Sequence, residues 1–259
     1  MSNRIANAFK EKAFVAFLTA GDPTIEKSEE YIGRLIDGGA DVIEIGIPFS
    51  DPIAEGPVIQ AANIRSLSAG CDLSKVFTLT ENVRKKYPDT AIVYLTYLNP
   101  VYKYGPDKFF AKCAEIGADG IIVPDMPFEE KGEIAEAAKK HGIEIVSLIA
   151  PTSEDRIKQI AEQAEGYIYI VSSMGVTGMR SEIKTDISAI VEAVRKYSDR
   201  PAAVGFGINT PEQAAKYSAI ADGVIVGSAI VKLIEQHGEN AGDALYEYAK
   251  KMKNACISQ

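Results

Sequence analysis

Eight short apolar runs recur along the chain at intervals of roughly 30 residues, about the length of one strand–helix unit. This spacing limits the possible folds more than any other feature. Most of the runs are near-continuous in Val and Ile, which is typical of parallel strands covered on both faces. The runs are residues 13–18, 41–46, 91–96, 119–123, 143–149, 166–172, 201–206 and 222–226. Eight such units in succession predict an α/β protein, a closed (β/α)8 TIM barrel.

The intervals between the runs have helical periodicity, and they predict helices at 24–37, 129–141 and 153–164. A short N-terminal helix is expected before the first strand. Several strands begin in a similar way, in GGADVIEIG, IGADGIIVPD and IADGVIVGS, which is weak internal repetition at the scale of one unit. No stretch has the composition of a linker, so residues 1–259 are expected to form a single barrel domain.

An open doubly wound sheet is the main alternative architecture, and it normally carries a glycine fingerprint at its first turn. The first turn here, residues 19–23, reads TAGDP and has no such pattern. A closed barrel is therefore favoured. In a barrel the chemistry lies at the C-terminal ends of the strands and on the loops that follow them.

Composition excludes several classes of partner. The formal net charge is −8, which argues against nucleic acid and means that an anionic ligand needs a local site. No apolar run reaches membrane-spanning length, and the N-terminus does not resemble a signal peptide. Three widely separated cysteines predict reduced thiols and a cytoplasmic location. No metal site is expected, because His141 and His237 each lie where a helix is predicted to end.

Three acids in the second strand and the loop after it are candidate functional residues. Glu44 lies among apolar residues on the strand, where an ionised carboxylate is costly unless it is paired or used. A structural ion pair is the alternative, but most strands contain no Lys or Arg to partner it. Asp51, beside Pro52, either shapes a turn or has a function. Glu55 is either a second catalytic acid or a solvated acid at a helix start, because Pro57 suits the first helical position.

Three glycine-containing loops are expected at one rim of the barrel. Loop 6, residues 172–180, is long enough to act as a lid. Loop 7, residues 205–210, leads into a helix near Pro211 that Asn209 or Thr210 caps. Loop 8, Gly227 and Ser228, opens onto a short helical run at 229–234. Loops 7 and 8 contain no Lys or Arg, so we expect them to bind a phosphate group through backbone N–H groups and the helix dipole.

Aromatic residues fall at or near the C-terminal ends of four strands, where they are expected to line an apolar pocket beside the phosphate site. They are Phe17, Tyr97, Tyr169 and Phe206. Core packing is the alternative for each of them alone. Together the patterns predict an amphipathic phosphorylated metabolite and a cofactor-free reaction driven by carboxylates.

The chain resembles the tryptophan synthase alpha subunit family over nearly its full length. The matching segments are FVAFLTAGDP (14–23), EIGIPFSDPIAEGPVIQ (44–60), YLNPVYKYG (97–105), IIVPDMP (121–127), GYIYIVSSMGVTG (166–178), GFGINTPEQ (205–213) and DGVIVGSAIVK (222–232). The resemblance implies a lyase of tryptophan biosynthesis that cleaves indole-3-glycerol phosphate to indole and glyceraldehyde 3-phosphate. It implies no cofactor or metal in this subunit. It also implies a beta subunit that holds pyridoxal phosphate, receives indole through a tunnel, and assembles with the chain as α2β2.

The resemblance also implies roles for individual residues. Glu44 matches the family's acid/base, and Glu55 stands where the family's loop acid contacts the indole N–H. Phosphate ligands match Gly178, Phe206, Gly207, Gly227 and Ser228, and the indole pocket matches Phe17, Ile59, Leu95, Tyr97 and Tyr169. Thr177 matches a threonine that meets the loop acid when the lid closes. The surface that faces the beta subunit matches Pro48, Asp51 and Asn99.

One position departs from the family pattern, because Glu55 replaces the aspartate of an ADGP motif. The charge is kept and one methylene is added, which displaces a group whose placement must be accurate. An alternative function is therefore a weakly active or inactive subunit that acts mainly as an allosteric partner of the beta chain. Other sugar-phosphate barrels use histidines or lysines at strand ends, and this chain offers none there.

Overall fold

The computed structural model describes residues 3–171, 186–205 and 207–258. Within them, eight parallel strands pair in sequence order, and β8 pairs with β1 to close the barrel. The strands are β1 (Ala13–Thr19), β2 (Val42–Gly46), β3 (Ala91–Leu95), β4 (Gly120–Ile122), β5 (Glu144–Ile149), β6 (Glu165–Val171), β7 (Ala202–Gly205) and β8 (Gly223–Val226). The predicted (β/α)8 barrel is confirmed, and each predicted strand agrees with the structure to within one residue at either end.

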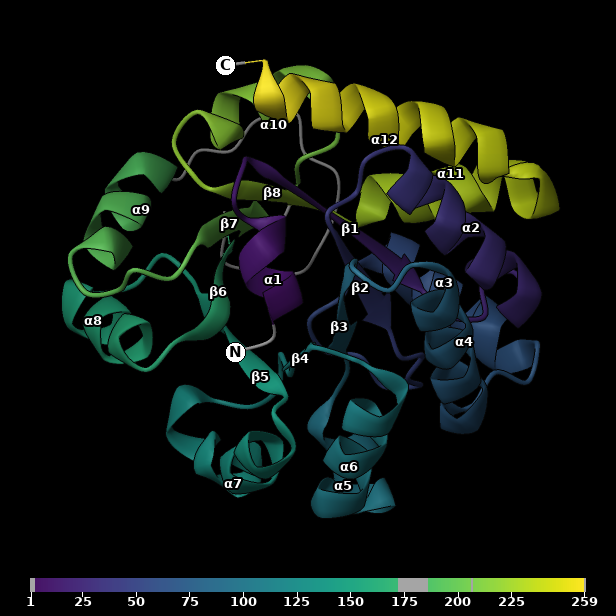
Figure 1. The fold of residues 1–259 in the computed structure, drawn as a ribbon, viewed down its shortest axis with the longest axis horizontal. Coiled ribbons are helices and arrows are strands. Elements are labelled where there is room, and N and C mark those ends of the chain that lie inside the picture. The colour runs from purple at the N-terminus through teal and green to yellow at the C-terminus, as the bar shows by residue number, and fades with distance from the viewer. Residues whose placement is uncertain (1–2, 172–185, 206, 259) are drawn as a thin grey trace.

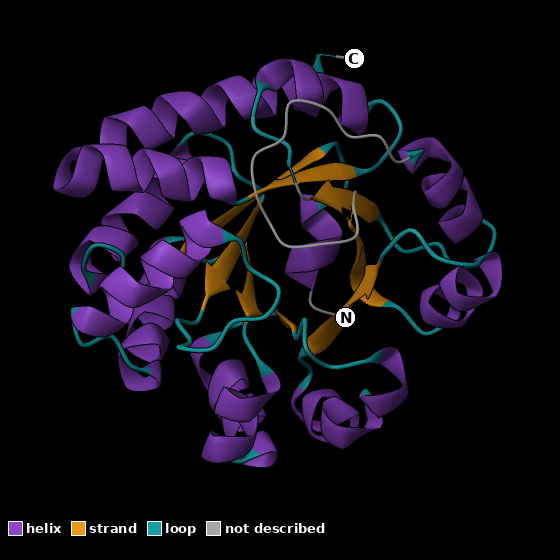
Figure 2. Cartoon of the chain, turned by 180° about the vertical axis from the view of Figure 1, so that it is seen from behind, coloured by secondary structure: helices purple, strands orange, loops and turns teal. Residues whose placement is uncertain are grey.

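Helices surround the barrel on its outer face, apart from α1, which lies over the centre of the barrel (Figure 1, Figure 2). They are α1 (Asn3–Ala8), α2 (Ile25–Asp37), α3 (Pro57–Ser68), α4 (Leu73–Lys86), α5 (Leu98–Tyr104), α6 (Pro106–Ile116), α7 (Gly132–His141), α8 (Glu154–Glu162), α9 (Ile187–Arg195), α10 (Pro211–Ser218), α11 (Ser228–His237) and α12 (Gly242–Ile257), with 3₁₀ turns η1 (Phe128–Glu130) and η2 (Gly238–Asn240). The single helix predicted at 129–141 is wrong in its first turn, because η1 ends before Gly132 and α7 begins there. Among the described residues, no helix is long and apolar enough to cross a membrane.

The strands divide their side chains between two apolar layers, because successive residues of a strand point to opposite faces. On β2, Ile43 and Ile45 pack outward against the helices, whereas Val42 joins the cluster inside the barrel. Glu44 has the same parity as Val42 and therefore points inward. The predicted N-terminal helix α1 closes the N-terminal mouth, where Ile5 is fully buried among the interior residues (Figure 1).

The weak sequence repeat at the strand starts has a structural counterpart. Each even-numbered strand has a carboxylate at its first residue or just before it. That carboxylate accepts a hydrogen bond from a backbone N–H of the preceding strand. Asp41 accepts from Phe14 at 2.7 Å, Asp119 from Ile92 at 2.9 Å, Glu165 from Ile145 at 3.2 Å and Asp222 from Ala202 at 2.9 Å. The same four acids pair with the basic side chains of Lys253, Arg84, Lys131 and Arg195. Each acid therefore joins two strands to the outer layer at the N-terminal end of the barrel.

Asp119 should be the most important of these acids for stability, because it is buried and pairs with both Arg4 and Arg84. Replacing it with asparagine keeps an acceptor for Ile92 but leaves two guanidinium groups without their anion. We expect Asp119→Asn to lower the free energy of unfolding by about 2 kcal/mol, measured by urea denaturation. The control is Asp107→Asn, which removes an exposed partner of Lys140 and His141 and should leave the midpoint unchanged. Equal effects of the two substitutions would contradict the assignment.

Candidate active site

Glu44 lies in the middle of β2, inside the barrel, and only 1% of its surface is exposed. The strand register places it between Phe17 of β1 and Val93 of β3. Its Oε1 accepts a hydrogen bond of 2.6 Å from the hydroxyl of Tyr167 on β6, across the barrel. The alternative of a structural ion pair is wrong for the described part of the chain, in which Glu44 has no basic partner.

Burial controls the protonation of Glu44. Loss of hydration raises its pKa to about 7, and the hydrogen bond from Tyr167 opposes the rise only in part. A carboxyl group with this pKa is close to half protonated at neutral pH, so it can both donate and accept a proton. Burial and the negative charge of Glu44 together raise the pKa of Tyr167 and Tyr169, so both phenols stay protonated.

Glu55 lies in the loop between β2 and α3, and it is buried with 5% of its surface exposed. Its Oε2 accepts a hydrogen bond of 2.5 Å from the hydroxyl of Tyr97, just after β3. The same hydroxyl accepts from the N–H of Ala54 at 3.0 Å, and Gln60 donates to the Glu55 carbonyl at 2.7 Å. The alternative of a solvated acid at a helix start is therefore wrong, although Pro57 does occupy the first position of α3.

The surroundings of Glu55 also favour its neutral form. Burial raises its pKa first of all, the hydrogen bond from Tyr97 opposes the rise, and the negative charge of Asp125 adds to it. Asp125 follows β4 and accepts from the backbone N–H of Leu98 at 3.0 Å, which holds it at the start of α5. The Tyr97 hydroxyl thus joins loop 2 to the end of β3, although Tyr97 and Glu55 are 42 positions apart in the sequence.

An apolar wall lies beside Glu44. Phe17 and Ile59 belong to one buried cluster, and Leu95 packs against it, as the proposed indole pocket requires. Tyr169 is buried on β6, where a Cβ added to Gly205 would come within 2.4 Å of its hydroxyl oxygen. Only glycine at position 205 leaves room for that phenol.

The loops after β7 and β8 lead directly into helices. Thr210 caps α10 in a reciprocal capping box with Gln213, which decides between the two predicted caps. Gly227 precedes α11, and Ser228 is its first residue, largely buried. The predicted short run at 229–234 is part of this longer helix. Gly207 has a φ of 101°, a conformation that favours glycine. Two helix N-termini therefore lie at the C-terminal ends of adjacent strands, as an anion site requires.

Three predicted ligands, Thr177, Gly178 and Phe206, lie outside the described residues. Of the three predicted to face a beta subunit, Asp51 and Asn99 are exposed, whereas Pro48 is buried within this chain. Ser50 donates a hydrogen bond to the carboxylate of Asp51 at 2.5 Å.

Sequence reasoning missed the two hydroxyl groups that hold the carboxylates. Tyr167 was not selected, although it lies two residues before Tyr169 and therefore on the same face of the strand. Tyr97 was predicted to line the pocket but not to hold Glu55. Strand periodicity could have indicated Tyr167, whereas only the folded loop brings Tyr97 to Glu55.

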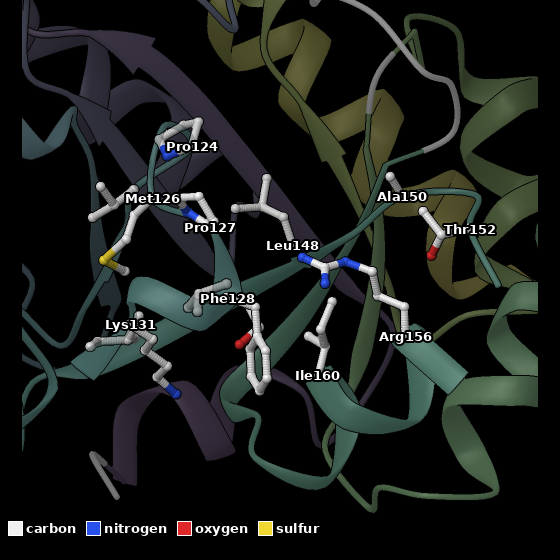
Figure 3. Close-up of a pocket in the computed structure, with 14 residues that line it drawn as sticks. Pro124, Met126, Pro127, Phe128, Lys131, Leu148, Ala150, Thr152, Arg156 and Ile160 are labelled. Atoms are coloured by element: carbon white, nitrogen blue, oxygen red, sulfur yellow. The ribbon is translucent and has the colours of Figure 1, made fainter. Parts of the chain in front are cut away.

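A separate cavity of about 230 Å³ lies between the loop after β4 and the region of β5 and α8 (Figure 3). Met126, Phe128 and Ile160 line it, and its cations Lys131 and Arg156 are paired with Glu165 and Glu129. Neither Glu44 nor Glu55 borders this cavity. The cavity therefore has no unbalanced positive charge for an anion, and the chemistry is better placed at Glu44 and Glu55.

A closed parallel barrel that buries one carboxyl group on β2, with a pKa raised to about 7, and a second in the loop after β2 defines the class of (β/α)8-barrel enzymes. A sequence model of the family described as tryptophan synthase alpha chain matches residues 4–257. The chain belongs to the tryptophan synthase alpha chain family.

Individual relatives agree with this assignment. The tryptophan synthase alpha chain of Lacticaseibacillus casei is 46% identical over 256 residues, covering 98% of this chain and 96% of the relative. The crystal structure of the alpha subunit from Legionella pneumophila str. Paris is similar with a TM-score of 0.91, at 36% identity, covering 99% of both chains. A chain from the α2β2 tryptophan synthase complex of Pyrococcus furiosus gives a TM-score of 0.87 at 35% identity, covering 94% of this chain and 98% of that one.

Proposed function

We propose that Glu44 and Glu55 carry out the proton transfer and charge stabilisation with which this member of the tryptophan synthase alpha chain family cleaves indole-3-glycerol phosphate. The family assignment makes the chain a lyase of tryptophan biosynthesis. The observation that supports the residue roles best is the burial of Glu44, which raises its pKa to about 7 in a barrel interior lined by apolar and phenolic side chains.

In the proposed reaction, the neutral carboxyl group of Glu44 donates a proton to carbon C3 of the indole ring, which becomes a cation. The resulting carboxylate then accepts the proton of the hydroxyl group on the carbon attached to C3. That hydroxyl becomes the aldehyde of glyceraldehyde 3-phosphate as the carbon–carbon bond breaks, and the bonding electrons return to the ring to give indole. One proton is donated and one is recovered, so Glu44 ends as it began.

Glu55 is proposed to accept a hydrogen bond from the indole N–H and to stabilise the positive charge that forms on the ring. Its raised pKa would fall as that charge develops nearby, because an opposite charge favours the carboxylate. Interactions that strengthen in the transition state are the ones that accelerate a reaction. Tyr97 holds the carboxylate in place at 2.5 Å before the substrate binds.

The phosphate group is proposed to lie at the N-termini of α10 and α11, near Gly207, Gly227 and Ser228. Backbone N–H groups and helix dipoles stabilise an anion there without a basic side chain. The apolar wall of Phe17, Ile59 and Leu95 is proposed to contact the indole ring. Gly178 and Phe206 remain predicted phosphate ligands, and Thr177 remains a predicted contact of the loop acid.

The proposed partner is a tryptophan synthase beta subunit in an α2β2 assembly, as in the Pyrococcus furiosus complex. Proton transfers and anion binding suffice for the proposed reaction, so we propose no cofactor in this chain, and pyridoxal phosphate would belong to the beta subunit. The three thiols, Cys71, Cys113 and Cys256, are buried and free, which supports a cytoplasmic location.

The direct test is release of indole from indole-3-glycerol phosphate by the purified chain, alone and with a beta subunit. We expect cleavage under both conditions. No cleavage under either condition, with phosphate binding retained, would favour the alternative of an inactive allosteric subunit.

The pH dependence of this reaction tests the role of Glu44. If its neutral form donates the first proton, kcat/KM should fall as the pH rises through about 7, the value to which burial raises its pKa. The measurement is steady-state indole release between pH 5 and 9, in buffers of constant ionic strength. A descending limb near the pKa of a free carboxyl group would contradict the assignment.

A further inference from the structure

We infer that Asn209 and Tyr248 are positioning residues for the turn after β7, and that together they set the affinity of the site for the phosphate group of the substrate. The inference rests on the proposed function in one respect, which is that the phosphate binds at this turn.

The turn is held internally by Asn209. Its side-chain Nδ2 donates to the carbonyl of Gly207 at 2.8 Å, and its backbone N–H donates to Oε1 of Gln213 at 2.8 Å. Gln213 also forms the capping box with Thr210, so the turn and the start of α10 form one hydrogen-bonded unit. Asn209 thereby fixes the peptide after Gly207, the residue with a positive φ.

Tyr248 joins this unit to a distant helix. Its hydroxyl, on α12, donates to the backbone carbonyl of Asn209 at 2.9 Å. Burial raises the pKa of Tyr248 far above neutrality, so the phenol remains a donor across the physiological range. Because the bond is made to a backbone carbonyl, it restrains the main chain of the turn rather than a side chain.

Helix α12 is a firm support for this bond. Near its C-terminal end, Lys253 donates to the carbonyl of Lys12 at 2.9 Å and to Asp41 at 2.8 Å. Arg34 of α2 donates to the carbonyl of Gly242 at 3.3 Å at the other end. The helix packs against both α10 and α11, whose N-termini form the proposed phosphate site (Figure 1). The Tyr248 hydroxyl therefore fixes the turn before α10 relative to α11.

A turn that is ordered before the substrate binds should affect the affinity for the phosphate group more than the rate of the chemical step. Backbone N–H groups that are already in place need no ordering when the anion arrives, and this favours tight binding. The phosphate group is bound in both the ground state and the transition state. Loosening the turn should therefore raise KM and leave kcat nearly constant.

The experiment compares Tyr248→Phe with Tyr246→Phe. Tyr246 lies on the same helix and contacts Arg34 and Lys250 through its ring, so its variant is a matched loss of one hydroxyl. The probe is glycerol 3-phosphate, whose Kd is measured by isothermal titration calorimetry, with KM and kcat for indole-3-glycerol phosphate measured in parallel. Loss of one hydrogen bond predicts a Kd and a KM raised about 3- to 10-fold by Tyr248→Phe, with kcat within about twofold. Tyr246→Phe should change none of them.

A second variant shows whether the two residues act on the same turn. Asn209→Ala removes the bond to Gly207 and should also raise the Kd, while the backbone carbonyl that Tyr248 contacts remains. The double variant should then raise the Kd by less than the product of the single effects. Independent effects that multiply would overturn the idea of one shared support.

Other outcomes separate the inference from the function on which it rests. Gly227→Ala tests the phosphate site itself and should weaken glycerol 3-phosphate binding. If it does, an unchanged Kd in Tyr248→Phe, or a reduced kcat at constant KM, would overturn the inference but not the phosphate site. An added Cβ at Gly227 would lie 3.1 Å from the ring of Phe17 and would crowd the site. No binding to the unmodified chain, or binding that Gly227→Ala leaves intact, would overturn both the phosphate site and the inference.

Discussion

Replacing Glu44 with glutamine should lower kcat for cleavage of indole-3-glycerol phosphate by about 10³-fold and should leave the affinity for glycerol 3-phosphate unchanged. Glutamine has nearly the same shape and can still accept the hydrogen bond from Tyr167. It cannot donate a proton to carbon or recover one from a hydroxyl group. The measurements are single-turnover indole release and calorimetric binding on the same protein samples.

The same substitution should also change stability in a pH-dependent way. Burial raises the pKa of Glu44 from 4.5 to about 7, so the folded state holds its proton more tightly than the unfolded state. The stability from this group is full below pH 4.5 and is lost as the pH rises through about 7. The loss is about 3 kcal/mol, so Glu44→Gln should exceed the unmodified chain in stability by about that amount at pH 8 and should match it near pH 4.

The control for Glu44 is Glu144→Gln. Glu144 is another largely buried strand carboxylate whose pKa burial raises, but it lies at the start of β5, at the opposite end of the barrel. Its variant should keep full activity. Near-normal turnover in Glu44→Gln, or an equal loss in both variants, would refute the catalytic assignment.

Shortening Glu55 to aspartate should lower kcat about tenfold, and Glu55→Gln should lower it about 10²-fold. The family pattern by itself predicts the opposite for aspartate, namely equal or faster turnover. The structure changes this expectation, because the glutamate side chain reaches the Tyr97 hydroxyl at 2.5 Å while its backbone is fixed by Gln60. An aspartate on the same backbone would fall short by one methylene group.

A double-mutant cycle with Tyr97→Phe tests this fit. If Tyr97 acts by holding the longer side chain, Tyr97→Phe should reduce the activity of the unmodified chain. In Glu55→Asp, adding Tyr97→Phe should reduce the activity little further. The phenylalanine ring keeps the stacking with Phe49, whose centroid is 5.1 Å from that of Tyr97, so only the hydroxyl is tested. Faster turnover in Glu55→Asp would show that loop 2 is not built around glutamate.

The sequence determined the architecture of this protein because the signals for strands and helices are local. Near-continuous Val and Ile runs at regular intervals define parallel strands buried on both faces, and eight of them close a barrel. Alternation along one strand places Glu44 on the same face as Val42, and the helix starts after β7 and β8 follow from capping residues and glycines. Each of these inferences depends on residues within one strand–helix unit.

Only the tertiary structure decided how the two carboxylates are held and where their pKa values lie. The partners of Glu44 and Glu55 are separated from them by 123 and 42 residues, and no local pattern pairs them. The support of the β7 turn by Tyr248 and the network of strand-start acids likewise depend on chain segments that meet only after folding. Desolvation, which sets the chemistry of Glu44, depends on the whole barrel that surrounds the side chain rather than on its sequence neighbours.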